Sequence, residues 1–276
     1  MGTASSSGKG PAPQTGKETI KKKIASAHKT GVLNLADQRL KSNSSSWALL
    51  TADALAPKLK TLDISGNQLK ALPVEIYLLS NLKSLFASNC SIQYTNDLSG
   101  LEKLTNLKLD HNDLEVDKIA ALPASLLMLN LSSNHLSGVP SILHTALLLT
   151  KLDISYNRLE SLVGIECLLN LTELNCDDNL LAELPESMGL MVKLRHLTAK
   201  RNKLSKRALT HLGQSIPPSL LANTALDNLE LTGNPIRKEE VLHFEGVESF
   251  LVRRKATKDK NFAGGGLVEV SIFGLD

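Results

Sequence analysis

LTKLDISYNRL, residues 149–159, contains the pattern that decides the fold of this chain of 276 residues. Leucine or isoleucine stands at its first, fourth, sixth and last positions, and asparagine at its ninth, Asn157. The alternation of Leu152 and Ile154 with polar residues predicts a short strand with one apolar face. Because that face is too small to be stable alone, the stretch must pack against others of its kind.

Related stretches occur eight more times along the chain. The positions equivalent to Asn157 are Gln38, Asn67, Cys90, Asn112, Asn134, Asn179, Asn202 and Asn234. From Asn67 to Asn202 they lie 22 or 23 residues apart, which is within the period of leucine-rich repeats. We therefore predict an α/β fold: a leucine-rich repeat solenoid, built as a curved right-handed array. A parallel sheet is expected on its concave face, with short helices and turns on its convex face.

The asparagine column has a physical cause. The chain turns sharply after each strand and leaves backbone N–H and C=O groups inside the solenoid, where water cannot reach them. An asparagine amide offers both donors and an acceptor for these groups. Cys90 is small enough to be buried in the column but forms weaker hydrogen bonds, so a looser rung is predicted there.

Composition agrees with this fold. Hydrophobic residues make up 42% of the chain and aromatic residues only 3%, so the core must be aliphatic. The three cysteines, Cys90, Cys167 and Cys176, all lie within repeats, whereas secreted repeat proteins usually carry disulfides at their ends. The N-terminus has no apolar signal segment, and no stretch approaches a membrane span. We interpret the chain as cytoplasmic.

Composition and pattern divide the chain into five segments: 1–16, a disordered tail; 17–30, a capping helix; 31–237, the repeats; 238–263, a C-terminal cap and basic segment; and 264–276, a flexible tail. The capping helix places Ile20, Ile24, Ala25 and Ala27 near one face. Two longer steps interrupt the repeats. One contains the anchoring residue Trp47, and the other, around residues 214–223, is expected to form a bulge or a helix on the convex side.

Several stretches resemble a known family. Residues 69–76 (LKALPVEI) and 181–188 (LAELPESM) resemble the LxxLPxxI class of cytosolic leucine-rich repeat proteins, and residues 163–171 are closer to a class found in a phosphatase regulator. Residues 28–35 and 253–263, near the two ends, also resemble a cytosolic member of the family. The resemblance implies short helical or 3₁₀ turns on the outer side and a cytosolic location. It implies no catalytic or ligand residues.

The concave face is the predicted partner-binding surface, because side chains between the core leucines line up there in columns. The surface is polar, mixed in charge and poor in aromatic residues. Phe86 and Tyr156 are the expected anchors, since large flat side chains are enriched at binding hot spots. The candidate partner-binding residues are Phe86, Lys108, Asp110, His111, Tyr156, Asp177, Asp178, His196, Lys200 and Arg201.

Adjacent repeats also place opposite charges side by side. The matched pairs are Lys151 with Glu173, Asp177 with Lys200, and Asp178 with Arg201. Two interpretations remain open. The pairs either neutralise one another, which contributes about 0–1 kcal/mol for each exposed pair, or recognise a partner. Recognition is favoured most for the basic cluster of His196, Lys200, Arg201 and Lys203.

Other functions have less support. A net charge of +3 and the scarcity of aromatic residues argue against nucleic-acid binding. Asp110, His111, Asp113 and His135 approach one another on neighbouring repeats, but exposed polar residues are ordinary there and no metal site is expected. Residues 10–19 depart from a phosphate-binding loop in spacing. The sequence therefore predicts no enzyme, cofactor or metal.

The first six residues, MGTASS, fit the pattern for N-myristoylation of Gly2. A single myristoyl chain binds membranes only marginally, so a second signal is required. Lysines near the capping helix could supply it by attracting anionic lipid, at up to about 1 kcal/mol each. They are Lys17, Lys21, Lys22, Lys23 and Lys29. The alternative is that these lysines only solvate the helix.

Together these observations predict a monomeric, non-enzymatic scaffold that binds a protein partner on its concave face. Gly2 would add a peripheral contact with an anionic membrane surface. The alternative is a regulatory subunit that modulates an enzyme such as a phosphatase or a small GTPase.

Overall fold

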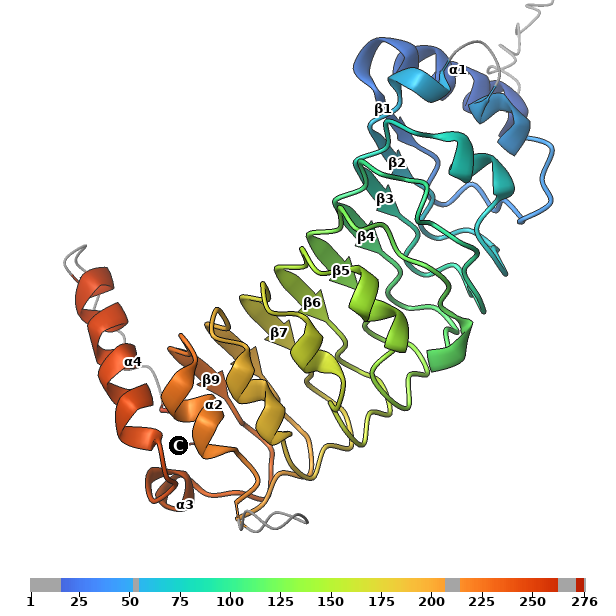
Figure 1. The fold of residues 1–276 in the computed structure, drawn as a ribbon. Coiled ribbons are helices and arrows are strands. Elements are labelled where there is room, and N and C mark those ends of the chain that lie inside the picture. The colour runs from blue at the N-terminus through green and yellow to red at the C-terminus, as the bar shows by residue number, and fades with distance from the viewer. Residues whose placement is uncertain (1–15, 52–54, 207–213, 263–271, 276) are drawn as a thin grey trace, which may run out of the picture.

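The computed structural model describes residues 16–51, 55–206, 214–262 and 272–275. In these residues nine short strands form one sheet in chain order, and the array bends into an arc (Figure 1). The strands are β1 (Val32–Asn34), β2 (Thr61–Asp63), β3 (Ser84–Phe86), β4 (Asn106–Lys108), β5 (Met128–Asn130), β6 (Lys151–Asp153), β7 (Glu173–Asn175), β8 (His196–Thr198) and β9 (Asn228–Glu230). All neighbouring strands are parallel, which confirms the predicted solenoid.

The register of the sheet follows from the leucine pattern. The central residue of each strand is a buried leucine, and it pairs with the central leucine of the next strand, as Leu129 does with Leu152. The residues on either side of it, such as Met128 and Asn130, point away from the core. A slip of one residue would expose a leucine in place of a polar residue, so burial holds every repeat in the same phase.

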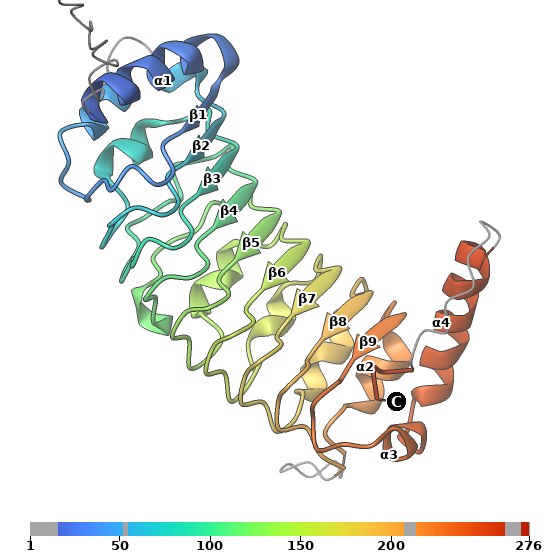
Figure 2. The ribbon, with the colours of Figure 1, turned by 180° about the vertical axis from the view of Figure 1, so that it is seen from behind.

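The outer side is built from short 3₁₀ helices (Figure 2). They are η1 (Trp47–Leu50), η3 (Ala56–Lys58), η4 (Val74–Leu78), η5 (Val116–Lys118), η6 (Ser141–Thr145), η7 (Ile165–Cys167) and η8 (Glu186–Leu190). Trp47 is fully buried and its Nε1 donates to the carbonyl of Lys41 at 2.8 Å, so it anchors the longer first step as predicted. The second long step forms α2 (Pro218–Asn223), which packs against η8.

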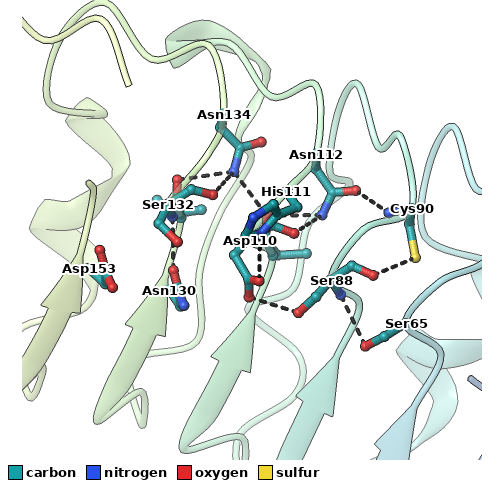
Figure 3. Close-up of polar contacts among 12 residues, drawn as sticks. Ser65, Ser88, Cys90, Asp110, His111, Asn112, Asn130, Ser132, Asn134 and Asp153 are labelled. Carbon is teal, nitrogen blue, oxygen red and sulfur yellow. Dashed lines mark hydrogen bonds and ion pairs between the residues drawn. The ribbon is translucent and has the colours of Figure 1, made fainter. Parts of the chain in front are cut away.

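A column of buried asparagines closes the turns between repeats (Figure 3). The Nδ2 group of Asn134 donates to the carbonyls of Leu109 and Leu131, each at 3.0 Å, and its Oδ1 accepts the N–H of Leu114 at 3.0 Å. Equivalent bonds are made by Asn67, Asn112, Asn157, Asn179, Asn202 and Asn234. Each amide bonds two consecutive repeats, so the column satisfies buried backbone and also ties the array together.

Cys90 interrupts this column, and backbone atoms compensate for the missing amide. Its Sγ donates to the carbonyl of Ile64 at 3.3 Å, while its own carbonyl accepts the N–H of Leu69 at 2.9 Å. Ser91 has a φ of +66°, a left-handed conformation that the residues following the column asparagines do not adopt. Burial raises the pKa of the Cys90 thiol to about 11, so the thiol remains protonated near neutral pH and serves only as a donor.

Helix α1 (Gly16–Thr30) covers the first repeat. Ile20 and Ala27 are buried against the core, with Ile24 partly buried between them, whereas Ala25 is exposed. Three of the four expected contact residues therefore face the core. Ala25 does not, because a helix turns by about 100° per residue and Ala25 lies to one side of the stripe.

The other end of the array, where a C-terminal cap and basic segment were predicted over residues 238–263, is helical. Two helices form there, α3 (Lys238–Leu242) and α4 (Val247–Phe262), with Gly246 between them. Gly246 has a φ of +84°, and a Cβ at this position would lie 2.6 Å from the carbonyl oxygen of Pro218, so no other residue fits. Arg253, which belongs to the predicted basic segment, donates to the carbonyl of Leu226 at 3.0 Å and to that of Leu221 near the end of α2.

Part of the tail that was expected to be flexible is packed against the last repeat. Phe273 is fully buried and stacks on Phe250 of α4, with ring centroids 5.3 Å apart. The carbonyl of Phe273 accepts the N–H of Leu231 at 2.7 Å, and the carbonyl of Gly274 accepts the hydroxyl of Thr232 at 2.8 Å. Residues 272–275 therefore cover the exposed edge of the sheet beside β9, which corrects the expectation for this part of the tail.

Candidate functional site

The concave face carries two columns of strand side chains, on either side of the buried leucines. The column at the third strand position was recognised in the sequence and includes Phe86, Lys108 and Asn130. Of the column at the first strand position, only Lys151, Glu173 and His196 were recognised. The column consists of Val32, Thr61, Ser84, Asn106, Met128, Lys151, Glu173, His196 and Asn228. Strand alternation indicates these residues as well, because positions two apart share a face.

A hollow of about 380 Å³ lies in the middle of this face, over β4 to β7. Its lining combines both columns and includes Asn106, Lys108, Met128, Asn130, Lys151, Asp153, Glu173 and Asn175. The Nζ of Lys151 lies 2.8 Å from Oε1 of Glu173 across neighbouring strands, so this predicted pair forms. The charges of this pair offset each other, and the rest of the lining consists of Lys108, Asp153, three asparagines and three apolar side chains.

Phe86 and Lys108 occupy paired positions on β3 and β4. The Nζ of Lys108 lies 5.4 Å from the centre of the Phe86 ring, a cation–π contact, and Phe86 is half-buried. The ring therefore shares one of its faces with the lysine. Phe86 is an anchor whose exposure depends on where the Lys108 side chain lies.

Asp110 and His111 form a small polar group after β4 (Figure 3). The Ser88 hydroxyl donates to Oδ1 of Asp110 at 2.7 Å, and Nδ1 of His111 lies 3.1 Å from Oδ2 of the same carboxylate. The Asp110 side chain is mostly covered while that of His111 is largely exposed. Of the two, His111 is the one available to a partner.

The four residues considered as metal ligands, Asp110, His111, Asp113 and His135, form two separate pairs. His135 Nε2 lies 3.8 Å from Oδ1 of Asp113, a pair separate from Asp110 and His111. Within the described part of the chain, no group of three His, Cys, Asp or Glu residues is arranged to hold a metal ion.

Tyr156, Asp178 and Arg201 come together just beyond the ends of β6 to β8. The guanidinium of Arg201 donates to both carboxylate oxygens of Asp178, from Nε at 2.6 Å and from Nη2 at 2.5 Å. Nη2 also donates to the Tyr156 hydroxyl at 3.4 Å. These hydrogen bonds from Arg201 lower the pKa of Asp178. The predicted Asp178–Arg201 pair is therefore present and extends to Tyr156, which is 55% exposed.

These three residues all have left-handed backbone, with φ of 53°, 53° and 50°. Gly66 and Gly233 occupy the equivalent positions near the two ends of the array, also with positive φ. A bulky side chain in this conformation costs about 1 kcal/mol relative to glycine. Tyrosine and arginine are therefore not the residues that backbone stability alone would select at positions 156 and 201.

The expected basic cluster is divided among separate acidic neighbours. His196 lies 3.6 Å from Asp227, whose buried carboxylate also accepts a hydrogen bond from Arg195 at 2.8 Å. Lys200 does not pair with the Asp177 carboxylate through its side chain. Its backbone N–H donates to Oδ1 of Asp177 at 2.7 Å, and its Nζ lies 4.0 Å from Glu230. Burial raises the pKa of Asp177. Three of the four cluster residues, His196, Lys200 and Arg201, thus have an acidic neighbour of their own.

Gly2, the predicted lipidation site, lies outside the described residues. Among the residues that are described, no helix has the length and apolar character required to cross a membrane.

Residues 57–114, which include β2 to β4, match the family model described as leucine rich repeat. The chain therefore contains leucine-rich repeats and has the leucine-rich repeat fold. The adenylate cyclase of Schizosaccharomyces pombe is 30% identical to it over 206 residues, which cover 63% of this chain but only 12% of the cyclase. This chain therefore spans a small part of that relative, and the similarity concerns that part alone.

Two solved structures show the same fold. An internalin (inlF) from Listeria monocytogenes superposes with a TM-score of 0.58 at 21% identity, over 82% of this chain and 60% of the internalin chain. A chain from the octameric complex of latrophilin 3, Unc5D and the leucine-rich repeat domain of FLRT2 superposes with a TM-score of 0.56 at 22% identity, over 78% of this chain and 72% of that chain. Leucine-rich repeat proteins generally act in protein–protein interaction, and the fold is mostly a non-enzymatic scaffold.

Proposed function

We propose that this protein is a monomeric, non-enzymatic scaffold that binds a protein partner on its concave face, over β4 to β7. The observation that carries the proposal is the hollow of about 380 Å³ in the middle of that face. The lining of the hollow suits a polypeptide, because it offers amide donors for hydrogen bonds beside the apolar side chain of Met128.

The amide donors are oriented by the turns that follow the strands. Oδ1 of Asn130 accepts the N–H of Ser132 at 2.8 Å, and Oδ1 of Asn175 accepts the N–H of Asp177 at 3.0 Å. Since the oxygen of each amide is used in this way, the Nδ2 group is the one left for a ligand. Neither Nδ2 group donates to another described residue. These donors suit the carbonyl oxygens of an extended peptide segment.

Anchors flank the hollow on two sides. Phe86 with Lys108 lies toward the first repeats, and Tyr156 with Arg201 lies along the rim beyond the strand ends. Tyrosine and arginine are enriched among residues that dominate binding energy, and both hold conformations that cost stability here. The FLRT2 complex, in which a leucine-rich repeat domain assembles with other proteins, supports this type of function.

Removing either anchor is expected to reduce capture of the partner by at least about tenfold, since loss of a hot-spot aromatic costs about 2 kcal/mol. The test compares the full chain with Phe86→Ala and Tyr156→Ala variants as baits in native-cell extract, with captured proteins quantified by mass spectrometry. Val163→Ala is the control, because Val163 is 67% exposed but lies beside η7, outside the sheet. A partner lost from the Val163→Ala bait and retained by the other two would place the interface elsewhere.

The second candidate is a regulatory subunit that modulates a phosphatase or a small GTPase. The likeness of residues 163–171 to a class found in a phosphatase regulator favours it. The same baits separate the two functions. A captured enzyme whose activity changes with the wild-type chain but not with Tyr156→Ala indicates regulation, and unchanged activity leaves the scaffold.

We also propose a cytoplasmic location with peripheral membrane attachment through N-myristoylation of Gly2. The proposal is supported by the MGTASS pattern and by the likeness of residues 28–35 and 253–263 to leucine-rich repeat-containing protein 57. Mass spectrometry of the N-terminal peptide from the native cell should show a myristoyl group on Gly2. Gly2→Ala should release the membrane-bound fraction, and an unmodified Gly2 would remove this part of the proposal.

A further inference from the structure

A second hollow, of about 650 Å³, lies at the edge of the sheet where β1 to β4 begin. Five exposed lysines line it, namely Lys29, Lys58, Lys60, Lys83 and Lys103. No aspartate or glutamate is among its lining residues, and none of the five lysines forms an ion pair with a described residue. Concentrated like charge in a concave site creates a positive potential before any ligand arrives.

The lysines come from consecutive repeats. Lys60 and Lys83 immediately precede β2 and β3. The residues in the same position before β5, β6 and β7 are Leu127, Thr150 and Thr172. Stacking therefore places Lys60 and Lys83 side by side at the edge of the sheet in the first repeats. Farther along the same edge, Arg195 precedes β8 and Asp227 precedes β9, and these two side chains form an ion pair. The cluster of lysines without acidic neighbours is therefore a feature of the first repeats.

Lys103 is held at the hollow by a hydrogen-bonded clamp. Its Nζ donates to Oδ1 of Asn81 at 2.5 Å, and Nδ2 of Asn81 donates to a backbone carbonyl at 2.8 Å. The same clamp recurs later, where Lys193 donates to Oδ1 of Asn170 at 2.7 Å. The later clamp lies two residues before Arg195, whose charge is paired with Asp227, so it provides an internal reference for a lysine held in the same way outside the lysine cluster.

The basic surface continues along α1. Lys22 and Lys29 are seven residues apart and therefore share a face of the helix, opposite the buried residues Ile20 and Ala27. Lys29 lines the hollow, and Lys22 extends the same charge toward the beginning of the helix. The N-terminal segment with Gly2 precedes this helix in the chain.

We propose that this hollow binds the polyphosphorylated headgroup of an anionic membrane lipid. Five lysines around one hollow carry more positive charge than a single phosphate needs. They are suited to a ligand with several phosphate groups close together, because lysine binds phosphate as a point charge. The hollow offers no aromatic platform for bases and no large apolar side chain to anchor a peptide. The proposal deepens the membrane part of the proposed function but does not require Gly2 to be acylated.

The test uses the full chain carrying Gly2→Ala, so that acylation plays no part. Its binding is measured by co-sedimentation with vesicles of phosphatidylcholine alone, with added phosphatidylserine, and with added phosphatidylinositol bisphosphate at matched total charge. We expect binding to the bisphosphate vesicles only. Adding Lys60→Gln, Lys83→Gln and Lys103→Gln together should weaken it about a hundredfold, since each lysine near the lipid contributes severalfold. Soluble inositol trisphosphate should compete.

The matched control carries Lys118→Gln, Lys193→Gln and Lys255→Gln, three exposed lysines elsewhere with the same change in net charge. It should bind within about twofold of the parent chain. An equal loss in the control, or equal binding to phosphatidylserine vesicles, would show diffuse attraction and overturn the proposal. Binding of inositol trisphosphate without binding to vesicles would show that the hollow takes a soluble phosphate compound and not a membrane lipid, which would overturn the proposal. None of these results bears on Gly2 or on the concave face, which have separate tests.

Discussion

Replacing Asn157 with alanine is expected to lower the free energy of unfolding by about 3 kcal/mol. The Nδ2 group of Asn157 donates to the carbonyls of Leu131 and Ile154 at 3.1 and 3.0 Å, and its Oδ1 accepts the N–H of Leu136 at 3.0 Å. Alanine leaves these three backbone groups buried without their partner. Each such group costs about 1–3 kcal/mol, and local relaxation recovers part of the total. Urea unfolding followed by circular dichroism measures the loss.

Cys90→Ala is the matched control, because Cys90 stands in the same column. It makes only weak hydrogen bonds through Sγ, and the backbone already supplies the acceptor for Leu69. Its loss should cost about 1 kcal/mol. If Asn157→Ala were no more destabilising than Cys90→Ala, the asparagine column would not be a main source of cohesion between repeats. A shallower transition in the Asn157→Ala variant would indicate that the array separates at that rung.

The sequence predicted the repeats well because their structure is local and periodic. The leucines, the asparagine and the strand all lie within eleven residues of one another in LTKLDISYNRL. Once the period is known, stacking sets the register, since a slip would place polar residues in the core. Even the departure at Cys90 was visible, although the compensating conformation of Ser91 was not, because it depends on the neighbouring repeat.

Features that depend on contacts between repeats were harder to predict. His196 looked like part of a basic cluster with Lys200, but its acidic neighbour Asp227 lies in the next repeat, beyond the insertion that contains α2. The lysines of the edge hollow stand outside the repeat motif, and each one resembles an ordinary solvated charge in the sequence. Only the alignment of the repeats reveals that they share one concavity.

The C-terminal tail shows the same limitation. The glycine-rich sequence at its start and its short length predicted mobility. The structure instead stacks Phe273 on Phe250, 23 positions earlier in the chain. The reason is the open edge of the sheet. In the interior, the N–H of Ala199 donates to the carbonyl of Glu230 in the following strand at 2.9 Å. The N–H of Leu231 has no following repeat, and the carbonyl of Phe273 accepts it in the equivalent way.

Phe273→Ala is therefore expected to destabilise the last repeat by about 3 kcal/mol, near the lower end of the range for truncating a buried phenylalanine. Phe273→Leu keeps most of the apolar volume but loses the stacking on Phe250, so it should cost about 1 kcal/mol. Thermal unfolding measures both, and hydrogen exchange at the Leu231 amide reports the edge directly. In a stacked array the terminal unit protects its neighbours, so exchange should quicken most beside β9 and least beside β1. Uniform acceleration, or none at Leu231, would mean that the tail does not serve as the final rung of the sheet.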